Sequence, residues 1–128
     1  MNKLINKTIA ICKVFFNVLN SVERLPECEP KYADKLVLKI HPKGYHMQIR
    51  KYKSNGRAEY DIDLHDHDED KEYTHGGIHI HYFGWRYIKK LNENKYIRLT
   101  GRNLTDEEYE FIQNIDYRDL IQIQVRYE

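Results

Sequence analysis

Cysteine is scarce in this sequence, with only Cys12 and Cys28 among 128 residues. Two cysteines do not make the disulfide framework of a small secreted protein, so we expect a reduced protein of the cytoplasm. A net charge of +1 provides no overall field to attract nucleic acid or a membrane. The sequence also contains no internal repeat, no glycine-rich phosphate-binding loop and no histidine pair of the metalloprotease kind. The motifs of the common nucleotide-binding and zinc-protease sites are therefore absent.

Long apolar runs are missing as well, even near the N-terminus, where Lys13 interrupts the apolar segment 9–12. This segment is too short to span a bilayer, and no small-residue cleavage site follows it, which argues against a signal peptide. Apolar residues recur instead at helical spacing along residues 4–25, and we predict an amphipathic helix that ends near Leu25. We expect its apolar stripe to pack on a sheet. The alternatives are a helix-mediated dimer and a peripheral membrane anchor.

Polar and apolar residues alternate along two later segments, residues 60–65 and 78–82. In both segments the even-numbered residues are apolar, whereas the odd-numbered ones are aspartate or histidine. Strict alternation indicates a strand with one buried face, because successive side chains of a strand point to opposite sides. We therefore predict two neighbouring antiparallel strands with an apolar face toward the core and a histidine-rich face on the other side.

A hairpin turn is predicted at Asn55 and Gly56, since both residues tolerate the positive φ angles of a two-residue type I′ turn. Counting outward from this turn gives three cross-strand pairs: Ile49 with Ile62, Arg50 with Asp61, and His46 with His65. A slip of one residue would place apolar side chains opposite polar ones, so the match on both faces supports this register.

Two further elements are predicted near the C-terminus. Thr105 and Glu108 have the spacing of a capping box, which predicts a short helix over residues 105–115. Residues 121–127 alternate between apolar and polar types, so we expect a last strand over residues 119–128.

Together these elements predict a single α+β domain over residues 1–128. An antiparallel sheet of five to six strands would carry the N-terminal helix (1–25) on its apolar face and the short helix before its last strand. A connector (26–34) leads to the other strands (35–104), which we expect to be interrupted at Gly84 and at residues 92–94.

The histidine-rich face predicts a metal site. Neutral imidazole is a preferred ligand of zinc and neighbouring transition metals, and two His-x-His pairs on adjacent strands present several ring nitrogens to one point. We expect Zn²⁺ to be the preferred ion. The candidate ligands are His65, His67, His79, His81 and Asp63.

A second hypothesis for the same face needs no metal. Two histidines, one neutral and one protonated, can serve as general base and acid in phosphodiester cleavage near neutral pH. The candidate catalytic residues are His46, His65 and His79, with Arg50 to stabilise the charge that develops on phosphorus. This hypothesis predicts a small, toxin-like ribonuclease.

Residues 82–104 are rich in aromatic and basic side chains, which is the combination that single-stranded RNA needs for stacking and for phosphate neutralisation. Aromatic residues are also the ordinary content of strands. The candidate nucleic-acid contacts are Tyr82, Trp85, Arg86, Lys89, Lys90 and Arg98.

Two interpretations without chemistry stay open. The histidine-rich face could simply be the solvated side of an antiparallel sheet. Alternatively, the protein could be a non-catalytic interaction or inhibitor protein of the kind carried by mobile elements or phages, which acts through its acidic segment 66–72 and its basic and aromatic strands. The acidic segment would imitate phosphates for a protein partner with a basic surface. Apart from the alternative of a peripheral anchor in the N-terminal helix, no interpretation predicts a membrane partner.

Overall fold

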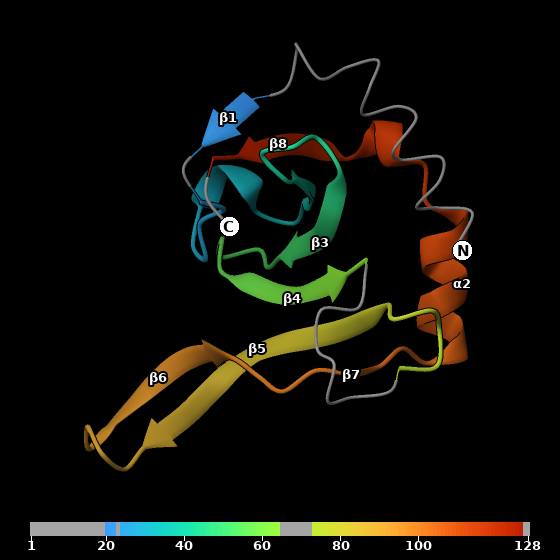
Figure 1. Ribbon diagram of the computed structural model, residues 1–128. Helices are drawn as coiled ribbons and strands as arrows, with labels where there is room; N and C mark the ends of the chain where they lie inside the picture. Colours follow the sequence, from blue (N-terminus) through green and yellow to red (C-terminus); the bar gives the residue numbers. More distant parts are fainter. Residues whose placement is uncertain (1–19, 23, 65–72, 127–128) are drawn as a thin grey trace.

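The computed structural model describes residues 20–22, 24–64 and 73–126 (Figure 1). Within these residues eight strands form one sheet in the order β1-β8-β2-β3-β4-β5-β6, and β7 pairs with β5. The strands in chain order are β1 (Asn20–Val22), β2 (Leu36–Ile40), β3 (His46–Tyr52), β4 (Ala58–Asp63), β5 (His79–Ile88), β6 (Glu93–Arg98), β7 (Arg102–Asn103) and β8 (Ile121–Val125). The helical elements are η2 (Pro30–Tyr32), α2 (Asp106–Asn114) and η3 (Tyr117–Asp119), where η denotes a 3₁₀ helix.

The sheet is mixed, so the predicted antiparallel fold is wrong. Strand β8 lies between β1 and β2 and runs parallel to both, while the strands from β2 to β6 pair with one another antiparallel. Alternation identifies a strand and its two faces, but it carries no information about the neighbour or the direction of that strand. The parallel return of the chain through α2 and η3 was therefore invisible in the pattern.

The predicted N-terminal helix on the apolar face is not shown either. Its last part, Asn20–Val22, is strand β1, and residues 1–19 lie outside the described part of the chain. In the described part, α2 and η3 contribute to the covering of the apolar face. Ile112 of α2 and Tyr117 of η3 pack in one buried cluster with Ile49, Ile62 and Ile80 of the sheet.

The C-terminal helix agrees with its sequence signal. The Thr105 hydroxyl accepts a hydrogen bond from the Glu108 amide at 3.1 Å, and the Glu108 carboxylate accepts one from the Thr105 amide at 2.8 Å. This capping box satisfies two backbone donors that a helix start leaves open. No described helix combines the length and the hydropathy that a membrane-spanning segment requires.

The β3–β4 register is confirmed, although the turn that led to it is different. Ile49 pairs with Ile62 and Arg50 pairs with Asp61, as predicted. Residues 54–56 form a three-residue loop, because the Lys53 amide donates to the Arg57 carbonyl at 2.8 Å, and Gly56 has a φ angle of +86°. A bulge shifts the pairing between Lys51 and Tyr52 and restores the predicted register further along the strands.

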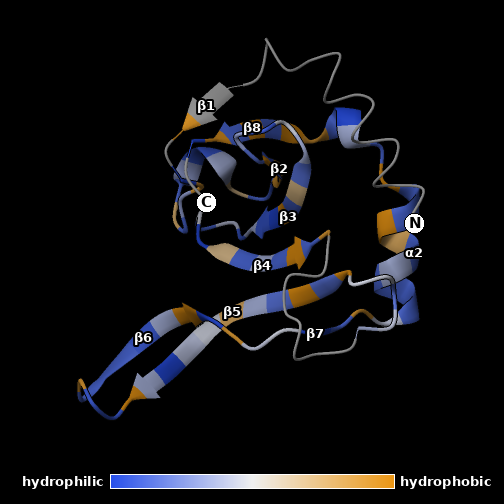
Figure 2. Ribbon diagram, viewed as in Figure 1, coloured by the Kyte–Doolittle hydropathy of each residue, from blue (hydrophilic) through white to orange (hydrophobic). Residues whose placement is uncertain are grey.

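Strand β5 joins β4 antiparallel, which is the predicted arrangement. Asp61 pairs with His81 and Asp63 pairs with His79, so both histidines share a face of the sheet with both aspartates. The predicted break at Gly84 is wrong, since β5 continues through it to Ile88 and forms with β6 a long hairpin that extends away from the rest of the sheet (Figure 1). Most of β6 is hydrophilic (Figure 2).

The face that carries Arg50 and the aspartates is buried and not solvated. The connector that follows β1 lies over it, and Leu25 and Tyr32 of this segment pack there with Val37, Tyr52 and Ile123 in a second buried cluster. The interpretation of this face as the wet side of the sheet therefore does not hold for its central residues. Polar groups in such a place need partners, because burial removes their water.

Candidate metal centre

Three of the predicted ligands meet between β4 and β5. Asp63 of β4 and His79 and His81 of β5 each offer one ligand atom, and these atoms all lie within 4.8 Å of one another. The Asp63 Oδ2 atom is 3.1 Å from His79 Nε2 and 3.5 Å from His81 Nε2. Alternation and the antiparallel register bring them together, since each side chain belongs to the same face. The three residues lie close enough to hold a metal ion.

The other ring nitrogen of each histidine is used by the backbone. His79 Nδ1 lies 2.8 Å from the Gly77 carbonyl oxygen, and His81 Nδ1 lies 2.8 Å from the Leu99 carbonyl oxygen. A carbonyl only accepts hydrogen bonds, so each Nδ1 atom must carry the hydrogen. In the neutral rings both Nε2 atoms then expose a lone pair toward Asp63. Such a backbone contact is the usual way in which proteins orient a metal-binding imidazole.

Two lone pairs that face a carboxylate oxygen require a positive group between them. A proton on His79 would satisfy one contact. His81 Nε2, however, is buried and has no hydrogen-bond partner among the described residues. Ligand atoms about 2.0–2.2 Å from a tetrahedral zinc ion lie about 3.3–3.6 Å from one another. The separation of 3.5 Å at His81 falls within this range, and the separation of 3.1 Å at His79 lies slightly below it.

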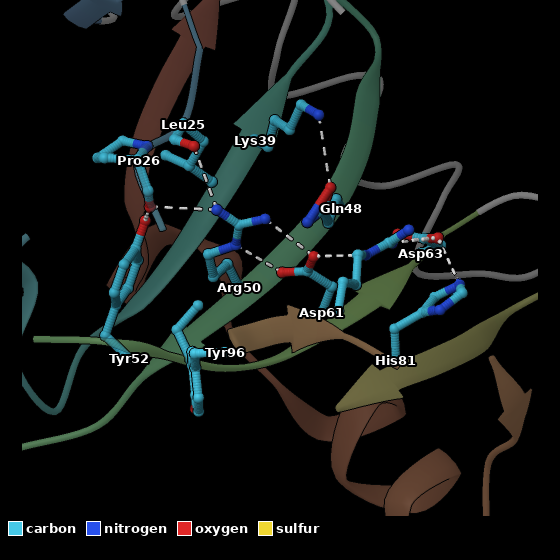
Figure 3. Close-up of polar contacts among 12 residues, drawn as sticks. Leu25, Pro26, Lys39, Gln48, Arg50, Tyr52, Asp61, Asp63, His81 and Tyr96 are labelled. Carbon is cyan, nitrogen blue, oxygen red and sulfur yellow. Dashed lines mark hydrogen bonds and ion pairs between the residues drawn. The ribbon is translucent and has the colours of Figure 1, made fainter. Parts of the chain in front are cut away.

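Burial is strong at this centre and differs between its members. The exposed fraction is 3% for Asp63 and 0% for His79, whereas the His81 side chain is 14% exposed. The centre is therefore open to solvent mainly beside His81. Figure 3 shows the His81 ring pointing at Asp63 from the neighbouring strand.

The two imidazoles have opposite pKa shifts. Burial disfavours the charged form of His79, but the contacts with Asp63 and with the Gly77 carbonyl outweigh it and raise the pKa of His79. Burial prevails at His81 and lowers its pKa, although the Leu99 carbonyl acts in the other direction. His79 thus has the greater tendency to hold a proton.

Arg98 of β6 neutralises both aspartates. Its Nη2 atom donates to Asp63 Oδ1 at 3.0 Å and to Asp63 Oδ2 at 2.8 Å, and its Nε atom donates to Asp61 Oδ2 at 3.0 Å. The same Asp63 Oδ2 atom faces both histidines, so a metal ion would share this oxygen with Arg98 or take it over. The sequence hypothesis assigned Arg98 to nucleic acid. The contact follows from the β5–β6 register, which pairs Arg98 with Phe83 and so places Arg98 on the face of the aspartates, and the sequence patterns did not predict this register.

Arg50 completes the polar network on the side away from the histidines. Its Nε and Nη2 atoms donate to the two carboxylate oxygens of Asp61 at 2.6 Å and 2.9 Å, and its Nη1 atom donates to the carbonyls of Leu25 and Pro26 (Figure 3). Burial opposes the charged form, but the contacts with Asp61 outweigh it and raise the pKa of Arg50. The predicted role of Arg50 on a phosphate stays a prediction, and all three of its donor nitrogens already have partners within the protein.

Tyr73 and Gly101 support the centre, and the sequence hypotheses missed both residues. The Tyr73 ring stacks on His79 with 4.1 Å between centroids and 7° between planes. A Cβ atom on Gly101 would lie 2.9 Å from both His81 Nε2 and the Tyr73 hydroxyl. No local pattern predicted these contacts, because Tyr73 and Gly101 both lie outside the alternating segments 60–65 and 78–82 from which the site was predicted.

The remaining predicted site residues lie elsewhere or outside the described residues. A bulge at β2–β3 pairs His46 with Ile40, a core residue, and turns its ring toward Tyr117 at 6.4 Å between centroids. Burial lowers the pKa of His46 to about 4. His65 and His67 lie outside the described part of the chain, so their predicted roles as ligands stay predictions.

The predicted nucleic-acid residues divide between the two faces of the β5–β6 hairpin. Trp85 and Arg98 lie on the face that also carries the histidines, whereas Tyr82 and Arg86 lie on the opposite face. Lys89 and Lys90 are exposed at the tip. No protein-family model matches the chain, and no curated protein and no solved structure matches it either, so the candidate centre has to be judged on its own geometry.

Proposed function

We propose that this protein binds a divalent transition metal ion, zinc in the first place, through Asp63 Oδ2, His79 Nε2 and His81 Nε2. The observation that carries the proposal is the buried His81 Nε2 atom, which has no hydrogen-bond partner among the described residues and faces a carboxylate oxygen. A single proton on His79 leaves this lone pair unsatisfied. A metal ion between the three atoms satisfies both imidazoles at once.

The donor set favours zinc over the hard cations. Two imidazole nitrogens and one carboxylate oxygen suit zinc and its transition-metal neighbours, whereas magnesium and calcium prefer oxygen ligands throughout. Asp63 Oδ1 lies 3.0 Å from Arg98 Nη2, so Arg98 can keep this oxygen when a metal takes Oδ2. The carboxylate would then bridge the metal and the guanidinium.

A site with three protein ligands leaves a fourth position for water. Zinc lowers the pKa of a bound water toward 7 and so supplies hydroxide for hydrolysis at neutral pH. Nucleic-acid hydrolysis is the reaction that we proposed from the sequence, and it stays a prediction. The metal-free acid–base alternative is less well supported, because the ring of His79 has no exposed surface with which to reach a substrate.

Elemental analysis of the untagged protein tests the proposal. We expect one zinc ion per chain, and we expect cobalt substitution to produce the visible absorption of a low-symmetry site. His81→Gln should weaken zinc binding at least about tenfold. Because this variant also removes the contact of Nδ1 with the Leu99 carbonyl, urea unfolding of the metal-free variant is measured beside zinc binding to show that it is folded. His75→Gln is the matched control, since His75 stacks on Tyr109 and is not a member of the three-ligand group.

Arg98→Met provides a second, opposite readout. Removing the guanidinium from Asp63 Oδ2 should tighten zinc binding, because a positive charge beside a metal ion repels it. A protein that takes up no zinc at micromolar concentration, with or without Arg98, would refute the proposal and leave a purely structural ion-pair network.

The interaction hypothesis, which relied on the acidic segment and on the basic and aromatic strands, is not tested by the structure, although Trp85 and Tyr87 of β5 are exposed. Its acidic segment, residues 66–72, lies outside the described residues, so an inhibitor function stays a prediction. The cytoplasmic location also stays a prediction, which rests on the small number of cysteines.

A further inference from the structure

The β5–β6 hairpin becomes a free two-stranded ribbon beyond Tyr82. Tyr82 is the last residue of β5 that pairs with β4, and from Phe83 onward β5 pairs only with β6. The ribbon extends away from the remaining sheet (Figure 1). Beyond Tyr82 no other strand of the described chain pairs with β5 or β6. The β3–β4 turn and the start of β4 contact one face of the ribbon, where the Tyr96 hydroxyl donates to the Ala58 carbonyl at 2.7 Å.

One face of this ribbon is aromatic. Phe83, Trp85 and Tyr87 alternate along β5, and Tyr96 of β6 lies opposite Trp85. Trp85 and Tyr87 are each 56% exposed, and Tyr96 supports the indole edge-on at 5.3 Å between centroids. Residues two apart on a strand are separated by about 6.8 Å, so the two exposed rings form a short row. Large apolar rings left in water on one surface are typical of a binding site.

Cations from a distant part of the chain flank these rings. The Arg57 guanidinium lies 5.2 Å from the Trp85 centroid and 5.3 Å from the Tyr96 centroid, and Lys53 lies 5.3 Å from Tyr96. Both cations come from the β3–β4 turn. The hairpin itself contains a single carboxylate, Glu93, which pairs opposite Ile88 on the other face. The aromatic face therefore combines exposed rings with positive charge and no carboxylate from its own strands.

We propose that this face, formed by Trp85, Tyr87, Tyr96, Arg57 and Lys53, binds single-stranded nucleic acid. Unpaired bases stack on Trp85 and Tyr87, and the phosphates lie against the cations of the β3–β4 turn. Stacking on exposed rings requires unpaired bases, since the bases of a duplex are covered by their neighbours, and it tolerates different base sequences. The proposal stands independently of the metal centre.

The structure refines the set of residues expected from the sequence. Tyr82 and Arg86 point to the opposite face, where they line a surface cavity of about 350 Å³ with Arg102. Arg102 is already engaged there by the Glu108 carboxylate at 2.8 Å and 3.0 Å. The aromatic face, with its exposed rings and flanking cations, therefore suits single-stranded nucleic acid better than the opposite face does.

Intrinsic fluorescence gives a direct test, because Trp85 is the single tryptophan of the chain. Titration with 12-nucleotide oligo(U) and oligo(dT) at low salt should quench its emission, and a duplex of equal length should bind more weakly. In fluorescence polarisation with labelled oligonucleotide, Trp85→Ala and Tyr87→Ala should each weaken binding about fivefold to 150-fold, the range of a lost base stack.

Matched variants test whether binding depends on this face or only on the total charge and exposed hydrophobic surface of the protein. Arg57→Gln should weaken binding and reduce its salt dependence more than Arg86→Gln, which removes the same charge from the opposite face. Phe111→Ala removes an exposed ring (47%) from α2 and should leave the affinity unchanged. Absence of binding by the folded protein, or binding that Trp85→Ala and Tyr87→Ala do not weaken, would overturn the proposal. Self-association that is lost in Trp85→Ala would also overturn it, since a second copy of the chain would then be the partner.

Discussion

Replacing Asp61 by asparagine should destabilise the protein more than any exposed substitution. Asp61 has no exposed surface and accepts hydrogen bonds from Arg50 at 2.6 Å and 2.9 Å and from Arg98 at 3.0 Å. Asparagine keeps the shape but removes the charge, and its amide group presents a donor to guanidinium donors. Arg50, only 7% exposed, would remain buried without a countercharge. Loss of one partner from a buried ion pair costs about 3–5 kcal/mol.

This cost is a large share of the total stability, which is about 5–15 kcal/mol for a folded domain. Urea unfolding at pH 7, followed by circular dichroism, measures it as a shift of the midpoint. The matched control is Glu93→Gln, whose ion pair with Lys95 has side chains 53% and 48% exposed. An exposed pair of this kind contributes less than about 1 kcal/mol.

Two outcomes distinguish the mechanism. The double variant Arg50→Met with Asp61→Leu should be more stable than Asp61→Asn alone, because it leaves no unpaired buried charge. If Asp61→Asn costs no more than Glu93→Gln, the reasoning about this buried network is refuted.

The remaining predictions concern a buried histidine and a turn glycine. Burial lowers the pKa of His46 from 6.5 to about 4. Between these pH values the imidazole is therefore protonated in the unfolded chain and neutral in the folded protein. The free energy of unfolding should not depend on this ring above pH 6.5 and should fall by about 3 kcal/mol as the pH is lowered to 4. In urea unfolding, His46→Leu should not show this loss. Equal losses in both proteins would contradict this assignment. Gly56→Ala should destabilise more than Gly76→Ala, since both glycines have positive φ but a Cβ atom on Gly56 would lie 2.8 Å from Pro30 Cα and one on Gly76 would contact nothing. Equal urea midpoints for these two variants would show that the close contact is unimportant.

Part of the candidate centre could be predicted from local pattern. Alternation placed Asp63, His79 and His81 on one face, and the polar and apolar matches across the hairpin identified the pairing of Arg50 with Asp61. These features follow from the two-residue period of a strand, which is a property of neighbouring residues.

Other parts depended on contacts between distant segments. The side chain of His46 lies on the opposite face from the predicted one because β3 has one more residue than β2 at the bulge. Such a bulge has no reliable local signature in the sequence. The reach of Arg98 to Asp63 depends on how β6 returns along β5. The position of Arg57 beside Trp85 depends on the packing of a turn against a separate hairpin.

The sequence by itself determined which side chains share a face wherever a strand runs without a bulge, because that arrangement is built into the backbone geometry of consecutive residues. Only the tertiary structure decided which strands are neighbours, that β8 runs parallel to β2, and that the connector after β1 covers the polar face. Those choices depend on the packing of the whole chain. Burial by that connector turned a row of polar residues into a network whose charges must be compensated.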